Sequence, residues 1–123
     1  MYFPYQDRKA IYCIARAMVY ADGKVEENEL KVLTLEMTRI GCALEEILEF
    51  EKGIGSYDAA EAVARISQFS ADKKKYVCAV LGALLIVDGN AADDELKLWS
   101  LTSMICGLPT MTVGEALEYM ASL

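Results

Sequence analysis

The 123-residue chain contains no histidine and only two prolines. Without histidine it lacks the side chain that proteins use most often as a general base and as a transition-metal ligand. Any catalysis would therefore depend on cysteine, carboxylate, lysine or tyrosine chemistry. Because prolines are few and 54% of the residues are hydrophobic, the composition excludes a disordered chain and predicts one folded domain over residues 1–123.

Long apolar runs are also absent from the sequence. The longest, Tyr76–Val87, has twelve residues, whereas a membrane-spanning helix needs about 20, so we expect a buried helix that does not cross a membrane. Residues 1–9 lack the apolar core of a signal peptide. The cysteines form no CxxC pair and are expected to be reduced thiols of the core: Cys13, Cys42, Cys78 and Cys106. Together these features predict a cytoplasmic protein.

Positive charge is scarce, since twelve Lys and Arg residues face nineteen Asp and Glu residues and the net charge is −7. This balance argues against nucleic-acid binding. The negative charge is concentrated in residues 22–51 and 88–123, with balances of −6 and −5, whereas residues 1–21 and 52–87 each carry +2. We therefore expect acidic surfaces and a separate basic one around Lys73–Lys75.

A shift of the sequence by 66 residues aligns residues 22–41 with residues 88–107. Seven of these twenty positions are identical, where ordinary amino-acid usage would give about one. Apolar positions before each segment match as well. The alignment predicts two copies of one supersecondary unit, over about 8–51 and 74–117.

Each copy has the pattern of two helices joined by an Asp-Gly turn. A glycine ends each copy's second helix, where we expect the left-handed backbone conformation. The expected helices span about 7–21, 26–40, 44–51, 57–68, 71–87, 93–106 and 112 onward. This predicts an all-α fold of about seven helices with two pseudo-symmetric halves.

Several side chains are expected to cap these helices or to fill the core. Ser56 and Ser70 are candidates for N-caps, and Thr112 can form a capping box with Glu115. Three methionines are expected to fill gaps in the core: Met104, Met111 and Met120.

Two acidic positions recur in both copies, as Asp22 and Glu29 in the first and as Asp88 and Glu95 in the second. Both glutamates lie at the edge of an apolar stripe, where a carboxylate must be paired, hydrogen-bonded or bound to a metal. Three interpretations stay open: helix capping, a site for Ca²⁺, Mg²⁺ or Mn²⁺, and a surface for a basic partner. An ordinary EF-hand is excluded, because its earlier ligand positions hold apolar residues or tyrosine.

The pattern Ala21-Asp22-Gly23-x-Val25-x-x-x-Glu29-Leu30, with the amphipathic helix before it, resembles the TerB-like family associated with tellurite resistance. The resemblance spans about Arg8 to Leu123. It implies a bacterial all-α bundle with two pseudo-symmetric halves and a non-catalytic role in a stress response. It also implies binding of metal ions and docking to Ter-type proteins, some of them membrane-bound. By position, the family's acidic residues fall on Asp22, Glu29, Asp88 and Glu95.

We therefore predict a non-catalytic, acidic binding or adaptor module. Its acidic corners would hold a divalent cation, a basic protein partner, or both, and it would reach a membrane only through a membrane-bound partner. Two alternatives are a carboxylate-dependent hydrolase and a purely structural oligomerisation domain.

Overall fold

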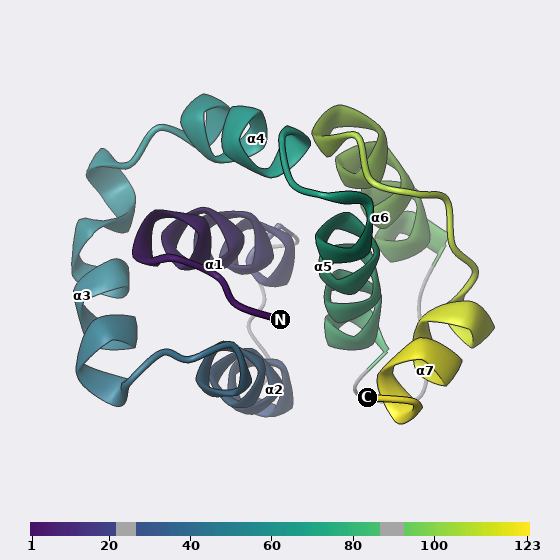
Figure 1. Cartoon of the computed structure of the whole chain (residues 1–123), viewed down its shortest axis with the longest axis horizontal. Coiled ribbons are helices and arrows are strands. Elements are labelled where there is room, and N and C mark those ends of the chain that lie inside the picture. The colour runs from purple at the N-terminus through teal and green to yellow at the C-terminus, as the bar shows by residue number, and fades with distance from the viewer. Residues whose placement is uncertain (22–26, 87–92) are drawn as a thin grey trace.

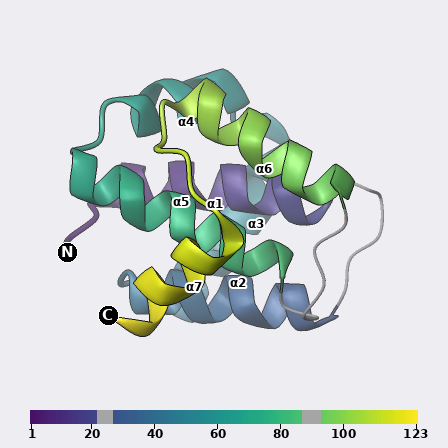
Figure 2. The ribbon, with the colours of Figure 1, turned by 90° about the vertical axis from the view of Figure 1, so that its right-hand side faces the viewer.

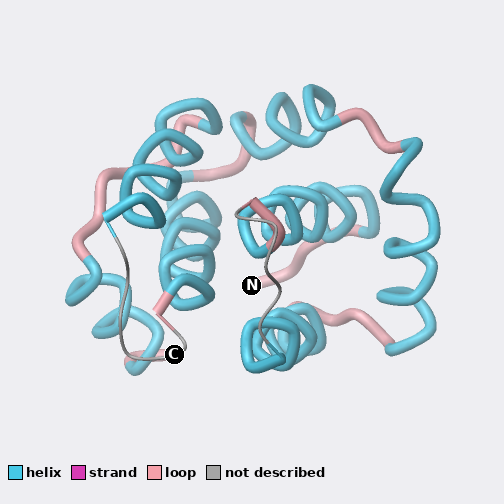
Figure 3. The backbone as a smooth tube through the Cα atoms, turned by 180° about the vertical axis from the view of Figure 1, so that it is seen from behind, coloured by secondary structure: helices cyan, strands magenta, loops and turns pink. Residues whose placement is uncertain are grey.

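The structure, a computed structural model, describes residues 1–21, 27–86 and 93–123. Within these ranges it is built of helices and contains no strand (Figures 1 and 3). A 3₁₀ turn covers Ile54–Ser56, and the α-helices are α1 (Tyr5–Val19), α2 (Glu27–Arg39), α3 (Leu44–Gly53), α4 (Ala59–Ser67), α5 (Ala71–Leu85), α6 (Asp93–Cys106) and α7 (Val113–Ala121). The predicted all-α fold of about seven helices is confirmed.

The boundaries of the helices repeat at the interval of 66 residues that aligns the sequence. Helices α1 and α5 both have 15 residues and begin 66 positions apart, and so do the first residues of α2 and α6. The glycines that follow α2 and α6 have positive φ, 108° at Gly41 and 69° at Gly107. Glycine adopts this conformation without a steric penalty, which explains why both helices end there.

The centre of the molecule is formed by α1 and α5. They contact each other, while α1 packs mainly on α4 and α5 mainly on α7 (Figure 1). Eight pairs of equivalent positions are buried in both helices: Ala10 and Tyr76, Ile11 and Val77, Tyr12 and Cys78, Cys13 and Ala79, Ile14 and Val80, Ala15 and Leu81, Met18 and Leu84, Val19 and Leu85. No helix of the described residues combines the length and the apolar character that crossing a bilayer requires.

The start of α4 differs from the expectation. Asp58, rather than Ser56, caps this helix by accepting a hydrogen bond from the backbone N–H of Ala60 (2.9 Å). Ser56 lies in the 3₁₀ turn, where its hydroxyl donates to the carbonyl of Gly53 (3.0 Å). Two other expected caps do form, at Ser70 and Thr112.

Two ion pairs attach α3 to α1. The guanidinium of Arg8 donates from Nε to Glu46 (2.6 Å), and that of Arg16 donates to Glu51 (2.8 Å). The hydroxyl of Tyr12 also donates to Glu51 (2.5 Å). Hydrogen bonds from the arginines lower the pKa of both glutamates. The two ion pairs therefore stabilise the folded state at neutral pH, and this stabilisation is lost as the pH falls through the lowered pKa values of the glutamates.

Helices α5 and α6 of the second copy approach each other closely at Gly82. The indole of Trp99 lies against Gly82, and a Cβ built on Gly82 would come within 2.6 Å of the Trp99 ring. The indole N–H donates to the carbonyl of Cys78 (3.1 Å), which fixes the ring in this position. In the first copy the equivalent residues are Arg16 and Leu33, so the Gly82–Trp99 contact is specific to the second copy.

Replacing Gly82 with alanine is expected to destabilise the protein, because the added methyl group must displace a buried indole. Overpacking of this kind costs about 1–3 kcal/mol in the free energy of unfolding. Urea unfolding at equilibrium measures the effect. Gly55→Ala is the matched control, since a Cβ there meets no atom within 4 Å. Equal stability of the two variants would contradict the proposed close packing.

Candidate functional site

Helices α1 and α5 end, and α2 and α6 begin, at the same end of the molecule (Figure 2). A pocket opens at this end. Its volume is about 340 Å³. We call it the acidic pocket, and it is lined by Met18, Val19, Ala21, Glu29, Leu85, Asp94, Glu95 and Leu98. Each of the four helices at this end contributes to its wall.

The acidic pocket brings together equivalent residues of the two copies. Glu29 and Glu95 occupy the same position in the repeat, and so do Val19 and Leu85. Both glutamates are half-buried. Asp22 and Asp88, the other two predicted ligands, lie outside the described residues. The sequence located the two glutamates separately, and it is the packing of α1 beside α5 that places them on one pocket.

The acidic pocket combines apolar walls with carboxylates at the first turns of two helices. Glu29 lies in the first turn of α2, and Asp94 and Glu95 lie in the first turn of α6. Carboxylates are favourable there because a helix N-terminus carries partial positive charge. Among the described residues, no group of three or more acidic or cysteine side chains has an arrangement that could hold a metal ion. Apolar walls with an acidic rim suit a cation that has an alkyl stem.

A second, mostly apolar pocket lies between α6 and the start of α7, with a volume of about 510 Å³. Met104 lines this pocket and is 75% exposed. The expectation that Met104 fills a gap in the core is therefore wrong: the helical spacing places it on the outer face of α6. Leu101 and Ile105 are also exposed on this helix.

The four cysteines are buried, as expected, and none of these described residues forms a disulfide. Burial raises the pKa of every one of the thiols, and at Cys42 the pKa reaches about 12. The thiols are therefore protonated at neutral pH, and a protonated thiol is a poor nucleophile.

A carboxyl and a phenol are buried together between α2 and α5. Glu36 and Tyr76 are each 6% exposed, and both line a small cavity of about 10 Å³. Arg39 approaches Glu36 at 3.4 Å from the solvent side. Burial raises the pKa of the Glu36 carboxyl, and it raises the pKa of Tyr76 to about 12. Unlike the acidic pocket, this site leaves no room for a ligand beyond about one water molecule.

The chain is similar over almost its whole length to a protein of unknown function from Porphyromonas gingivalis, whose crystal structure is known. The two share 42% sequence identity with a TM-score of 0.89, and the match covers 98% of this chain and 92% of that one. No protein-family model and no curated protein matches the chain.

Replacing Glu36 with glutamine is expected to stabilise the protein more at about pH 7 than at about pH 3. The raised pKa means that the ionised carboxylate is disfavoured in the folded state, so native Glu36 lowers stability as the pH rises through its pKa. Glutamine keeps the shape and removes this charge. Urea unfolding at both pH values measures the difference, with the exposed Glu49→Gln as control. A variant that is less stable than the native protein at about pH 7 would contradict the expectation.

Proposed function

Because the chain belongs to the same family as the Porphyromonas gingivalis protein, whose function is unknown, we propose a function from its own residues: a binding module that receives a basic side chain of a partner protein in the acidic pocket. The single observation that carries this proposal is the meeting of Glu29 and Glu95, one from each copy, on a pocket with apolar walls. No catalytic step is part of the proposed role.

The chemistry of the pocket favours arginine or lysine as the group that enters it. The alkyl stem of either side chain can lie along Met18, Leu85 and Leu98 while its charged head reaches the carboxylates. Arginine fits best, because a planar guanidinium can donate two parallel hydrogen bonds to one carboxylate. The surrounding charge supports this role, since residues 22–51 and 88–123 carry balances of −6 and −5.

A peptide titration tests the proposal. The probes are capped pentapeptides with a central arginine or, as the neutral comparison, a central glutamine. The arginine peptide should bind with shifts of the backbone amide signals of Val19 and Leu98, and its affinity should fall with added salt. In the double variant Glu29→Gln/Glu95→Gln the affinity should fall about tenfold, as expected for the loss of hydrogen bonds to charged groups.

The matched control is Glu49→Gln/Glu118→Gln, which removes the same charge from exposed positions on α3 and α7. This control should bind the arginine peptide as the native protein does. Equal affinity for the arginine and glutamine peptides would contradict the proposal. An equal loss of affinity in the two double variants would contradict it as well.

A divalent cation is the second candidate ligand, because Glu29, Asp94 and Glu95 all line the acidic pocket. These three carboxylates are not arranged to hold a metal ion by themselves, so further ligands would have to complete the site. Carboxylate oxygens are the preferred ligands of Ca²⁺, Mg²⁺ and Mn²⁺. The resemblance to the TerB-like family points to the same class of ligand and adds Asp22 and Asp88. The site would then stiffen the corner between helices by neutralising neighbouring carboxylates, in keeping with a role in a bacterial stress response.

Thermal unfolding separates this candidate from the first. If a cation binds only the folded protein, millimolar Ca²⁺, Mg²⁺ or Mn²⁺ must raise Tm, by an amount set by the ratio of the ion concentration to Kd. The variant Asp22→Asn/Glu29→Gln should lose most of this increase. The metal candidate fails if none of the three ions changes Tm, or if the variant responds as strongly as the native protein.

A further inference from the structure

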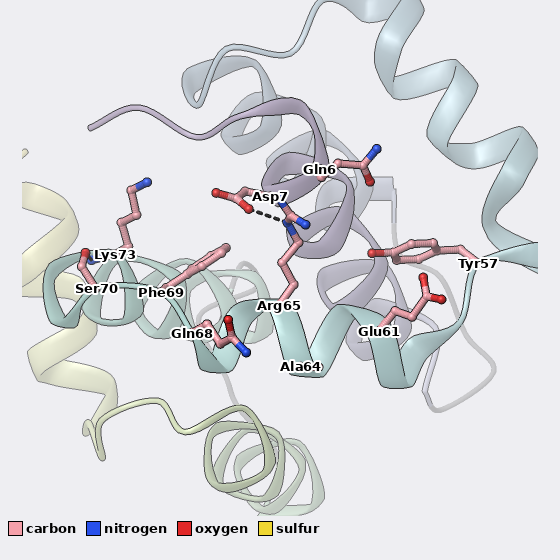
Figure 4. A pocket seen from close by; sticks show the side chains of 10 residues that line it. All are labelled: Gln6, Asp7, Tyr57, Glu61, Ala64, Arg65, Gln68, Phe69, Ser70 and Lys73. Atoms are coloured by element: carbon pink, nitrogen blue, oxygen red, sulfur yellow. Dashed lines mark hydrogen bonds and ion pairs between the residues drawn. The ribbon is translucent and has the colours of Figure 1, made fainter.

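We propose that a polar groove at the opposite end of α1 and α5 binds a short peptide segment that carries an acidic side chain. The groove lies between the start of α1, one face of α4 and the start of α5, and its volume is about 670 Å³ (Figure 4). Ligand sites in proteins usually have volumes of about 300–1,000 Å³. We call it the polar groove, and its lining includes Gln6, Tyr57, Arg65, Gln68, Phe69 and Lys73.

Arg65 is the group that would bind the acidic side chain. Its Nε donates to Asp7 Oδ1 at 2.6 Å, and Asp7 is well shielded, with 13% of its side chain exposed, whereas 45% of Arg65 is exposed. Among the hydrogen bonds of the described residues, Arg65 uses only Nε. Asp7 therefore holds the Arg65 guanidinium in place. The two terminal nitrogens of Arg65 remain available for the two parallel hydrogen bonds that a carboxylate of the ligand accepts.

Two further side chains set the direction of the ligand. Figure 4 shows Lys73 at one end of the polar groove, beside Phe69, and Glu61 at the other end, beside Tyr57. The Lys73 ammonium lies 5.1 Å from the centre of the Phe3 ring, which restrains it on this side of the groove. An acidic side chain is thus attracted toward Lys73 and repelled from Glu61.

The remaining lining residues favour a peptide over a small inorganic anion. Gln6 comes from α1 and Gln68 from α4, and each amide can both donate to a peptide carbonyl and accept from a peptide N–H. The half-buried rings of Tyr57 and Phe69 offer apolar surface for neighbouring side chains of the ligand. An inorganic anion would use only the hydrogen-bond donors and cations of the groove, and neither the glutamine carbonyls nor the aromatic rings.

The distribution of charge along the chain supports an acidic ligand at this end. The polar groove is built from residues 1–21 and 52–87, the two stretches that each carry a balance of +2 in a chain of net charge −7. The acidic stretches supply the first turns of α2 and α6 at the other end. A ligand with negative charge is therefore directed to the polar groove and away from the acidic pocket.

The experiment is a titration followed by the backbone amide signals of the full chain. The probes are capped pentapeptides with leucine at both ends and glutamate, glutamine or lysine in the centre. The glutamate peptide should bind at least tenfold more tightly than the other two, because it alone makes charge-assisted hydrogen bonds to Arg65. The shifted signals should be those of Gln6, Gln68 and Ser70, rather than those around the acidic pocket.

Two variants locate the interaction without leaving Asp7 unpaired. Arg65→Lys keeps the charge but removes the pair of parallel donors, and Lys73→Gln removes the second cation. Each variant should lower the affinity for the glutamate peptide about tenfold and have little effect on the affinity for the glutamine peptide. Lys97→Gln is the matched control, since Lys97 is exposed on α6 and lines neither site. Thermal unfolding confirms that each variant is folded.

Each of three results would overturn the proposal. Equal affinity for the glutamate and glutamine peptides would remove the acidic preference. Acetate or inorganic phosphate binding as tightly as the glutamate peptide would show a simple anion site. A loss of affinity in Lys97→Gln as large as that in Lys73→Gln would show an effect of net charge alone. Because the proposed function is tested with arginine peptides and Glu29 and Glu95 variants, the two proposals fail independently.

Discussion

The packing of α1 beside α5 is the contact on which the rest of the structure depends. Both helices are largely buried, and Leu81 and Leu84 of α5 are completely so; burying one such side chain contributes roughly 1.5–3 kcal/mol. The two helices run in the same direction, since their first turns border the polar groove and their last turns border the acidic pocket (Figure 2). Equivalent ends of the two copies therefore lie side by side, so residues of both helices line the site at each end of the molecule.

The copies differ where each is adapted to its own neighbours. The second copy has Gly82, so Trp99 of α6 can approach α5 closely. The first copy has Arg16 at the position of Gly82, and its guanidinium reaches out to Glu51 of α3. The first copy thus gains an ion-paired outer helix, whereas the second gains a buried indole that bonds to the carbonyl of Cys78. The two copies share most of the buried positions of α1 and α5, while their contacts with the neighbouring helices differ.

The parts of the structure that the sequence predicts are those that local patterns encode. Apolar periodicity located the helices, and the residues after α2 and α6, Gly41 and Gly107, have the positive φ expected of them. The cap of α4 and the exposed position of Met104 were missed, because the first depends on the competing 3₁₀ turn and the second on which side of α6 meets the core. The meeting of Glu29 with Glu95 on one pocket, and the addition of Asp94, follow from the relative placement of helices that lie 66 residues apart in sequence. The polar groove follows from tertiary packing, which brings Gln6 and Asp7 of α1 against residues 57–73.

Under the two proposals, the two ends of the molecule would have different binding preferences, because the charged groups at each end lie a helix length apart. A 15-residue helix is about 22 Å long, more than twice the distance of about 8 Å over which physiological salt screens exposed charges. The carboxylates of the acidic pocket therefore have little electrostatic effect on a ligand at Arg65 and Lys73, and the reverse also holds. The proposed basic side chain and the proposed acidic segment would then bind at opposite ends, each with little influence on the affinity of the other. Because α1 and α5 are buried in the core and extend from one proposed site to the other, they would set the separation of two such partners, as the proposed adaptor role requires.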